Sequence, residues 1–382
     1  MAIVLTGATG FVGSHLLSEL LRQDAPVIAL VRQEPELARA RLACAVAATG
    51  AGPEQLRRLD SVRLVQSDLE QPLLGLEQSS FHDLAREIDT LWHCAAHIDL
   101  DAPEQAARRV NVDGTRRILQ LAEAAEQPVH LVHMSTAFVA GRRPSGTVSE
   151  DDLDGTHGFV NSYEQSKYEA EVLVRDWAAA RRTAVTVLRP GVLVTSRPPA
   201  PRAPRHPHAV IGARLAVLAS RGLERILRRA GLPLPDSGHV TARLAVDPQA
   251  AINILPVEYA APAILRLASA PHPGGVRTHH VVHPNDTLVK ACFQAVAGHV
   301  PGLDVRTVPQ FSDPTPLEQL LEHLSPLASG YRAFGRRYDR STLDAADAAA
   351  GVSPPPALDV DYLARTFATC PPHPTPGAEA AH

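Results

Sequence analysis

The sequence predicts an α/β fold built on a doubly wound parallel sheet, and two patterns support this class. Short, almost continuous apolar runs alternate with segments of helical period through the first half of the chain. Strands that are covered on both faces by crossover helices have this composition. A glycine-rich turn, TGATGFVG, joins the first apolar run to the first helical segment. We therefore expect a Rossmann sheet, followed by a smaller C-terminal substrate-binding lobe.

The elements of the expected sheet follow one another in a regular order. Apolar runs predict strands at residues 2–7, 27–32, 62–69, 90–96, 129–136 and 184–191. The 3.6-residue period predicts helices at residues 11–23, 34–48, 108–126 and 162–180. This alternation of strands with helices indicates that the strands run parallel.

The character of the sequence changes after residue 190. Residues 197–208, RPPAPRAPRHPH, contain too much proline for regular structure. Beyond them we expect helices at 209–231, 286–298 and 316–324, a strand that turns into a helix at 252–268, and a strand at 276–284. We assign residues 1–190 to the sheet domain, residues 191–370 to the smaller lobe with its additional α/β elements, and residues 371–382 to a disordered tail.

Composition limits the class of protein. The chain of 382 residues carries a formal net charge of -4, which argues against a nucleic-acid-binding protein. No apolar run is long enough for a membrane span, and the N-terminus lacks the regions of a signal peptide. The four cysteines are scattered without a CxxC pair, so we expect reduced thiols and no metal site. These features predict a soluble cytoplasmic protein.

The glycine turn has the context of a dinucleotide-binding motif. Thr6, Gly7, Gly10 and Gly13 lie between a predicted strand and a predicted helix. Gly7 allows the tight turn, Gly10 lets a pyrophosphate approach the backbone, and Gly13 lets the helix pack against the strand. The helix N-terminus adds partial positive charge for the phosphates. The alternative is a glycine turn with a purely structural role.

The second and third strands indicate which dinucleotide is bound. The second strand ends at Arg32, where an NAD site usually has an acidic residue, and Arg39 and Arg41 follow. A guanidinium suits the 2′-phosphate of NADPH, so we expect NADPH. The alternative, which the nearby Glu34 keeps open, is a solvated surface arginine. Asp68, after the third strand, is placed to accept a hydrogen bond from the adenine amino group; the alternative is a turn-capping aspartate.

A tyrosine and a lysine share one face of the helix predicted at 162–180. The chain has only two lysines, Lys167 and Lys290, and Lys167 lies four residues after Tyr163. A fixed ammonium favours the phenolate and lowers the pKa of a tyrosine, which is otherwise near 10. It can also donate to ribose hydroxyls. This spacing predicts an acid–base pair beside a bound nicotinamide.

The preceding strand supplies a hydroxyl partner. The segment HMSTAFVAG ends this strand and offers Ser135 and Thr136. Ligands bind at the carboxyl ends of strands in such sheets, and a hydroxyl there can stabilise negative charge on a carbonyl oxygen. The alternative is that both hydroxyls only cap the strand.

These motifs together resemble those of the extended short-chain dehydrogenase/reductase superfamily. The closer resemblance, over about residues 2–300, is to its thioester-reductase and fatty acyl-CoA reductase branch, which is called male-sterility-like. The motifs that carry it are TGATGFVG, LVR, HCAAHIDL (93–100), NVDGT (111–115), STAFVAG (135–141), NSYEQSKYEAE (161–171), LRPGVLVTSR (188–197) and INILPVEYAAPAI (252–264).

The resemblance implies roles for particular residues. Counting back five positions from Gly141 puts the catalytic hydroxyl on Thr136, beside Tyr163 and Lys167. Asn111 matches a position that supports the active-site architecture. The implied cofactor contacts are Thr6, Gly7, Thr9, Gly10, Phe11, Val12, Gly13, Arg32, Arg41, Asp68, Leu69, Ala95, Ala96, Lys167 and Pro190.

The resemblance also implies a reaction. NADPH would give hydride to the carbonyl carbon of an acyl thioester on coenzyme A or on an acyl carrier protein. Thr136 and Tyr163 would hydrogen-bond the oxyanion, and the thiohemiacetal would collapse to an aldehyde and a free thiol. A second hydride would give an alcohol. Residues 1–190 would then be the NADP-binding domain with the catalytic residues, in an enzyme of lipid or natural-product biosynthesis.

Three other functions stay open at this point. The same triad would serve a ketoreductase of a free, polyketide-like molecule. A nucleotide-sugar epimerase or dehydratase would hold NAD, which Arg32 argues against. A non-catalytic NADP-binding protein usually lacks the tyrosine and lysine.

The segment 197–229 is strongly basic. It holds eight arginines and one acidic residue, Glu224, in a chain of negative net charge. Such a segment would dock an acidic acyl carrier protein or hold the phosphates of coenzyme A. The alternative is a solvated amphipathic helix with an arginine-rich loop.

Overall fold

The computed structural model describes most of the chain. The described residues are 2–23, 26–100, 102–221, 225, 227–228, 239–270, 274–319 and 330–368. The tail expected at 371–382 lies outside them, as do the end of the helix expected at 316–324 and part of the arginine-rich segment.

Seven parallel strands form the central sheet, which confirms the predicted fold class. Their order is β12-β7-β5-β4-β1-β2-β3, so the chain reverses its direction of travel between β1 and β4. The strands are β1 (Ala2–Thr6), β2 (Val27–Val31), β3 (Arg63–Gln66), β4 (Ile88–His93), β5 (His130–Met134), β7 (Ala184–Pro190) and β12 (Gly275–Val281). The inner strands are buried on both faces, which explains why their apolar runs are nearly continuous.

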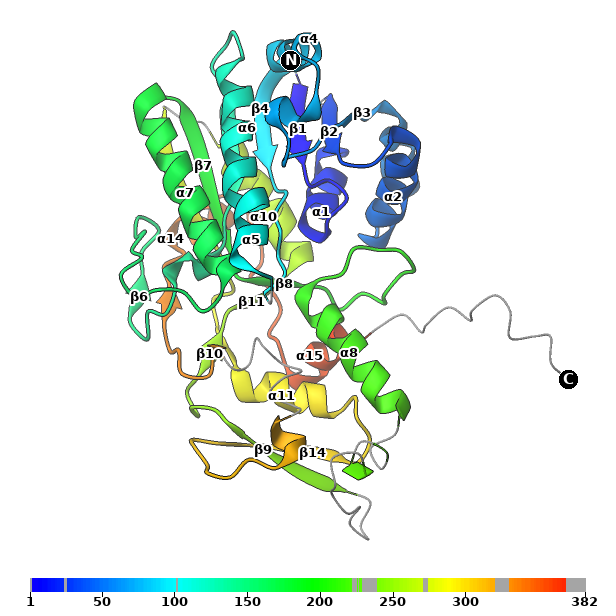
Figure 1. Ribbon diagram of the computed structural model, residues 1–382, viewed down its shortest axis with the longest axis vertical. Helices are drawn as coiled ribbons and strands as arrows, with labels where there is room; N and C mark the ends of the chain where they lie inside the picture. The colour runs from blue at the N-terminus through cyan, green and yellow to red at the C-terminus, as the bar shows by residue number, and fades with distance from the viewer. Residues whose placement is uncertain are drawn as a thin grey trace, which may run out of the picture.

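Helices cover both faces of this sheet (Figure 1). One face packs against α1 (Phe11–Leu20), α2 (Pro35–Ala48), α10 (Val257–Ser269) and α14 (Ser341–Ala349). The other face packs against α4 (Gln78–Glu87), α6 (Gly114–Glu123) and α7 (Ser162–Arg181). Short elements complete this part: α3 (Pro53–Arg58), α5 (Glu104–Arg108), β6 (Thr147–Val148), β15 (Arg337–Tyr338), and helical turns at Leu59–Ser61, Pro72–Gly75, Arg109–Asp113 and Ala137–Ala140.

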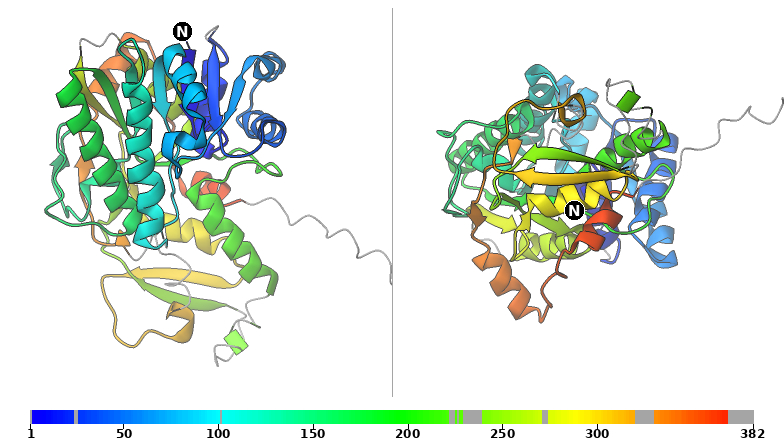
Figure 2. Two further views of the ribbon diagram at one scale, coloured as in Figure 1. Left: turned by 45° about the horizontal axis from the view of Figure 1, so that its top comes forward. Right: turned by 90° about the horizontal axis from the view of Figure 1, so that it is seen from below.

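A second, smaller group of elements lies beyond one end of the sheet. It has its own apolar core and contains α8 (Pro207–Arg221), α11 (Val289–Ala297), α15 (Val360–Thr366), and the parallel pair β9 (Val240–Ala245) and β14 (Leu303–Val308). The β9–β14 pair forms the end farthest from the sheet (Figure 2). Short pairings of β8 (Val192–Val194) with β11 (Ile254–Pro256), and of β10 (Ala251–Ile252) with β13 (Thr287–Leu288), lie between the two groups.

The second half of the chain is divided between both groups. Residues 191–370 were expected to form the lobe, but β12, α10 and α14 belong to the sheet and its helical cover. The register of β12 runs from Gly275 opposite Ala184 to Val281 opposite Pro190. The sequence pattern did not indicate this interleaving, because an apolar strand does not identify its partner.

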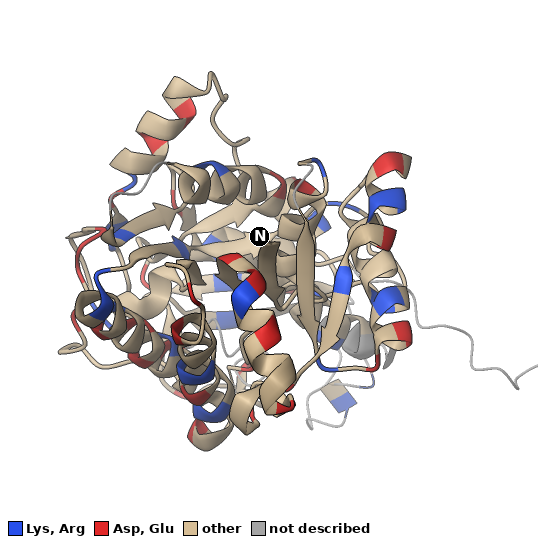
Figure 3. Ribbon diagram, turned by 90° about the horizontal axis from the view of Figure 1, so that it is seen from above, with Lys and Arg blue, Asp and Glu red and all other residues tan. Residues whose placement is uncertain are grey.

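Charged residues lie mainly on the outer helices, whereas the central strands carry few (Figure 3). Within the part of the chain that the structure describes, no helix combines the length and the apolar character needed to cross a bilayer.

A buried ion pair joins α7 to the sheet. The side chains of Glu171 and Arg189 are both 0% exposed. The Arg189 Nε and Nη2 atoms donate to the Glu171 carboxylate at 3.0 and 2.6 Å. Ser135 Oγ and Arg175 Nε donate to the same carboxylate at 2.7 and 3.0 Å. Burial alone would raise the pKa of Glu171, but Arg189 outweighs it and holds this pKa below its usual range.

Replacing one partner of this pair leaves a buried charge without compensation. We predict that Glu171→Gln lowers the free energy of unfolding by about 3 kcal/mol, measured by urea denaturation. Since the pKa of Glu171 is lowered in the folded state, its contribution is present at neutral pH and is lost as the pH falls through that lowered value.

The matched control is Glu169→Gln, two residues earlier on α7. Glu169 pairs with Arg108 at the surface, where an ion pair is worth about 0–1 kcal/mol. If the two variants lost the same free energy of unfolding, the claim that the buried Glu171–Arg189 pair stabilises the fold more than a surface pair would be wrong.

Candidate active site

The candidate site lies at the carboxyl edge of the sheet. Strands β1, β4, β5 and β7 end at the edge that faces the smaller lobe (Figure 1). Open α/β sheets bind ligands outside this edge, where the strand order reverses. The residues predicted for cofactor binding and for catalysis follow the ends of these strands.

The glycine turn between β1 and α1 leaves no room for side chains. Gly7 has a φ of 74°, and a Cβ atom built on it would lie 2.7 Å from the Ala95 backbone nitrogen. A Cβ on Gly13 would collide with the carbonyl oxygen of Gly7. The amide of Gly10 donates to that same carbonyl at 2.8 Å, which closes the turn.

The first turn of α1 is open to an anion. Gly10 is the N-cap, and no side chain caps this end of the helix. The amides that follow, of Phe11, Val12 and Gly13, are the groups that a helix N-terminus offers to a phosphate. The close backbone packing and this uncapped end fit the pyrophosphate of a dinucleotide.

The Thr6 side chain holds the glycine turn against the end of β4. Its side chain is buried, and its Oγ1 atom accepts hydrogen bonds from the amides of Cys94 and Ala95 at 3.1 and 3.0 Å. It also lies 3.0 Å from His93 Nδ1. Thr6 therefore ties β1 to the end of β4 and places Ala95 and the following Ala96 beside the glycine turn.

The arginines predicted for the 2′-phosphate differ in their surroundings. Arg32 and Arg41 are exposed and form no ion pair or hydrogen bond with the described residues. Arg39 is engaged instead, since its guanidinium donates to the carbonyl oxygens of Leu59 and Val62 at 2.7 and 2.9 Å. Arg32 and Arg41 can thus reach a ligand without breaking an internal contact.

Asp68 shapes the turn after β3. Its Oδ1 atom accepts from the amide of Glu70 at 2.9 Å, which is the capping role that the sequence left as an alternative. Its other carboxylate oxygen bonds to no described residue and stays available. Leu69 is fixed nearby, because Arg117 donates to its carbonyl oxygen at 2.8 Å and Gly114 packs against its side chain.

The hydroxyls of Thr136 and Tyr163 meet at the end of β5. Tyr163 occupies the first turn of α7, and its hydroxyl lies close enough to Thr136 for their interaction to lower its pKa. Thr136 Oγ1 also lies 3.5 Å from the carbonyl oxygen of Pro190 at the end of β7. Ser135 points elsewhere, into the Glu171–Arg189 pair. The structure therefore brings Thr136, and not Ser135, to the tyrosine.

Lys167 lies one turn along α7 and is buried. Its Nζ atom donates to the carbonyl oxygen of Met134, two residues before Thr136, at 2.6 Å. Burial lowers the pKa of Lys167 to about 8, while Cys94 and Glu171 act in the opposite direction. The ammonium form thus still predominates at neutral pH.

The pKa of Tyr163 is raised, whereas the sequence pattern alone suggested a lowered value. Burial raises it to about 12, the bond to Thr136 opposes this, and the charge of Glu164 adds to it. The physical reason is that desolvation of the phenolate dominates, while the Lys167 ammonium donates to the Met134 carbonyl oxygen. Tyr163 is therefore held as a phenol, the form that can donate a proton.

Asn111 braces the start of α7 from a π-helical turn. Its Oδ1 atom accepts from the amide of His97 at 2.7 Å. Its Nδ2 atom donates to the His97 carbonyl oxygen at 3.0 Å and to Ser166 Oγ at 2.8 Å. π-Turns of this kind are frequent at functional sites, and here the turn brings Asn111 beside the helix that carries the tyrosine.

Sequence reasoning missed several buried groups near the lysine. Glu171 continues the stripe of Tyr163 and Lys167 by one more turn, and this spacing was the available signal. His133 is buried, and neither of its ring nitrogens bonds to a described residue. Its ring lies 5.6 Å from that of His93, and nothing in the chain pattern marked either histidine.

The proline-rich segment packs against the glycine turn. The His206 ring lies 5.1 Å from that of Phe11, and His206 is buried. Burial lowers the pKa of His206 to about 4, so the ring is neutral at neutral pH. The segment before α8 therefore covers the side of α1 that carries the predicted cofactor contact Phe11.

Comparison with known proteins identifies the family of this chain. Residues 5–264 match the model of the NAD-binding Male sterility protein family. The isonitrile lipopeptide synthase of Streptomyces coeruleorubidus is 36% identical over 195 residues, which are 50% of this chain and 13% of that protein. The L-2-aminoadipate reductase large subunit of Penicillium chrysogenum is 32% identical over 209 residues, 50% of this chain and 15% of that protein.

A solved structure shares the whole architecture. The terminal R domain from the myxalamid PKS-NRPS biosynthetic pathway has a TM-score of 0.67 and 28% sequence identity, and the match covers 96% of this chain and 89% of that domain. The chain thus corresponds to a small part of the curated relatives and to nearly all of this domain. It belongs to the NAD-binding Male sterility protein family and is an oxidoreductase of the extended short-chain dehydrogenase/reductase type.

Proposed function

We propose that this chain is an NADPH-dependent reductase of acyl thioesters, held on a carrier protein or on coenzyme A. Its product would be an aldehyde or an alcohol in lipid or natural-product biosynthesis. The observation that carries the proposal is the contact between the Thr136 and Tyr163 hydroxyls beside Lys167, at the sheet edge below the glycine turn. The names of the relatives, a lipopeptide synthase, an aminoadipate reductase and a terminal R domain, favour a thioester over a free ketone.

Each residue of the site has a separate role in the proposed reduction. When bound, NADPH supplies the hydride. Thr136 and Tyr163 donate hydrogen bonds to the substrate carbonyl oxygen, where negative charge develops. Tyr163, which is a phenol at neutral pH, then gives its proton to that oxygen. Lys167 supplies a fixed positive charge behind the tyrosine. The resulting thiohemiacetal loses its thiol and leaves the aldehyde.

Three observations support NADPH over NADH in this proposal. The second strand ends without an acidic residue, and Arg32 and Arg41 are exposed. Neither guanidinium is committed to another described residue. A dianionic 2′-phosphate is the ligand that two such groups would bind best.

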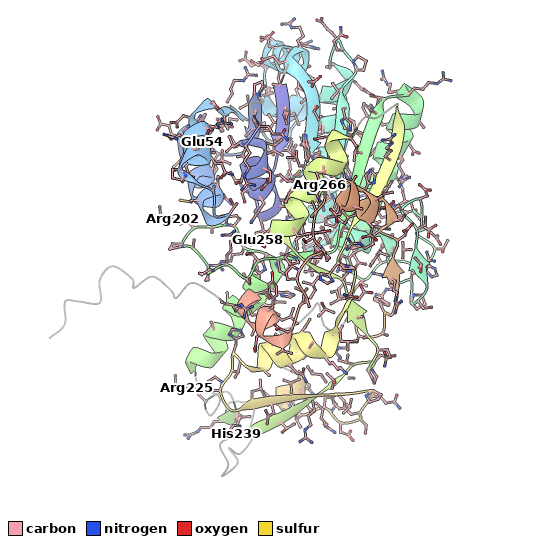
Figure 4. All side chains as sticks on the ribbon, turned by 180° about the vertical axis from the view of Figure 1, so that it is seen from behind. Glu54, Arg202, Arg225, His239, Glu258 and Arg266 are labelled. Atoms are coloured by element: carbon pink, nitrogen blue, oxygen red, sulfur yellow. The ribbon has the colours of Figure 1, made fainter. Side chains whose placement is uncertain are left out.

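An acidic carrier protein would dock at the arginine-rich segment. The described arginines that are exposed there are Arg202, Arg205, Arg214, Arg225 and Arg228. Arg202 and Arg225 both point outward on the same side of the molecule (Figure 4). Arg197 contributes less positive charge to this surface, because its Nε atom lies 3.2 Å from Glu258 Oε1 in an ion pair. Arg202 lies on the side of the lobe nearer the sheet, whereas Arg225 lies near His239 at the far end of the lobe (Figure 4). A carrier protein that contacts both would lie along this side of the lobe.

The first prediction concerns the reaction. Tyr163→Phe should lower kcat by about 1,000-fold or more, because the proton donor is lost, while NADPH binding stays unchanged. The assay follows NADPH oxidation and thiol release with acyl-CoA and acyl-carrier substrates beside free ketones. Tyr168→Phe, on the same helix, is the control. Ketone turnover without thiol release from any thioester would overturn the proposed substrate class.

The second prediction concerns the cofactor. Arg32→Ala and Arg41→Ala should each raise the KM for NADPH by roughly 10-fold and leave the KM for NADH almost unchanged. Arg22→Ala serves as the control, since among the described residues the Arg22 side chain pairs with Glu19, just after the end of α1. Equal increases in the KM values for NADPH and NADH would show that these arginines do not bind the 2′-phosphate.

The third prediction concerns the carrier. The triple variant Arg202→Glu/Arg205→Glu/Arg225→Glu should raise the KM for an acyl-carrier substrate by roughly 10-fold, and the effect should shrink at high salt. The KM for a short acyl-pantetheine thioester should not change. Arg116→Glu on α6 is the control for charge reversal elsewhere. Equal effects on both substrates would contradict docking at this segment.

A further inference from the structure

The C-terminal segment 330–339 lies alongside the loop that leaves the catalytic threonine. The amide of Gly335 donates to the carbonyl oxygen of Pro144 at 2.9 Å. Strand β15 in this segment pairs in parallel with β6, with Arg337 opposite Thr147. Residues far apart in the chain are therefore joined next to the site.

One side chain of this segment contacts both catalytic elements. Tyr331 is 4% exposed, and its ring packs edge-to-face against Phe138 with 5.2 Å between the ring centres. Its hydroxyl donates to the Glu164 carboxylate. Phe138 comes two residues after Thr136, and Glu164 directly follows Tyr163. Tyr331 thus lies between the segments that carry the two reacting hydroxyls.

Glu164 is held in place from several sides. Its side chain is 0% exposed, and its Oε2 atom accepts from the amide of Val160 at 2.9 Å. Its own amide donates to the N-cap side chain of Asn161 at 3.0 Å. A Cβ atom on Gly330 would collide with the Val160 side chain, so only glycine lets Tyr331 approach this closely.

We propose that Tyr331 is a positioning residue of the active site, whose hydroxyl fixes the Glu164 carboxylate at the first turn of α7 and so sets the charge beside Tyr163. The proposal rests on the proposed function in one respect, that Tyr163 is the proton donor. It adds a residue from the C-terminal part of the chain, which packs against the site without touching substrate.

The sign of the effect follows from the charges. Burial raises the pKa of Glu164, and the Tyr331 hydroxyl counters this by favouring the carboxylate. The charge of Glu164 in turn raises the pKa of Tyr163. Removing the Tyr331 hydroxyl should therefore release the Glu164 carboxylate from this position, weaken its effect on Tyr163 and so lower the pKa of Tyr163. The other groups that face Glu164 and Tyr331 are Arg142, Arg336 and Asn161. Thr136 faces Tyr163. The groups around Lys167 are Cys94, His93, His133 and Glu171.

The test is a titration of the Tyr163 phenol in the complex with NADP⁺, whose positive charge brings the phenolate into a measurable range. The ultraviolet signal of tyrosinate is recorded against pH, and the signal of Tyr163→Phe is subtracted. The midpoint should fall by about half a pH unit in Tyr331→Phe and by about one unit in Glu164→Gln. The double variant should match Glu164→Gln, because the hydroxyl acts through the carboxylate.

The matched control is Tyr338→Phe, which removes the hydroxyl of a half-buried tyrosine from the same segment. That hydroxyl accepts from Arg336 Nε at 2.8 Å, and its loss should leave the midpoint unchanged. A midpoint in folded Tyr331→Phe that coincides with the wild type would overturn the proposal, as would an unchanged midpoint in Glu164→Gln or a wild-type difference signal with no titrating phenol. Should Tyr331→Phe not fold, Glu164→Gln carries the same expectation. The readout needs only bound NADP⁺, so failure to reduce a thioester leaves it interpretable.

Discussion

The approach of the Tyr163 hydroxyl to Thr136 is the contact that the proposed chemistry requires. One hydroxyl comes from the end of a strand and the other from the first turn of a helix. Two buried carboxylates hold these elements together. Glu171 joins α7 to Arg189 and Ser135, and Glu164 joins the start of the same helix to Tyr331. Both elements that carry the proposed catalytic hydroxyls are thereby anchored by buried side chains.

The interleaving of the chain gives this arrangement its rigidity. Strand β12 completes the sheet beside β7, and the segment 330–339 returns to pack on the loop after Thr136. The second half of the chain therefore contributes paired strands and buried side chains to the sheet group as well as to the lobe. A reductase that must exclude water from a reacting thioester gains from such a scaffold, because fixed donors lose no energy in reorganisation.

Local patterns in the sequence predicted the sheet, its covering helices and the dinucleotide turn, since each depends on nearby residues. The spacing of Tyr163 and Lys167 likewise marked one helical face. The partners of β12 and the position of Tyr331 could not be predicted, because they depend on contacts between distant segments. The raised pKa of Tyr163 was missed for a similar reason: burial, its largest cause, is a property of the folded chain.

The central claim is that hydride reaches the carbonyl carbon of a thioester at this site. The most direct measurement uses NADPH labelled with deuterium on the transferring face of its nicotinamide, an acyl thioester as substrate, and mass spectrometry of the product. The account predicts one deuterium on the former carbonyl carbon of the aldehyde, released together with one thiol. An unlabelled product, or deuterium that appears only in the alcohol from an added ketone, would contradict it.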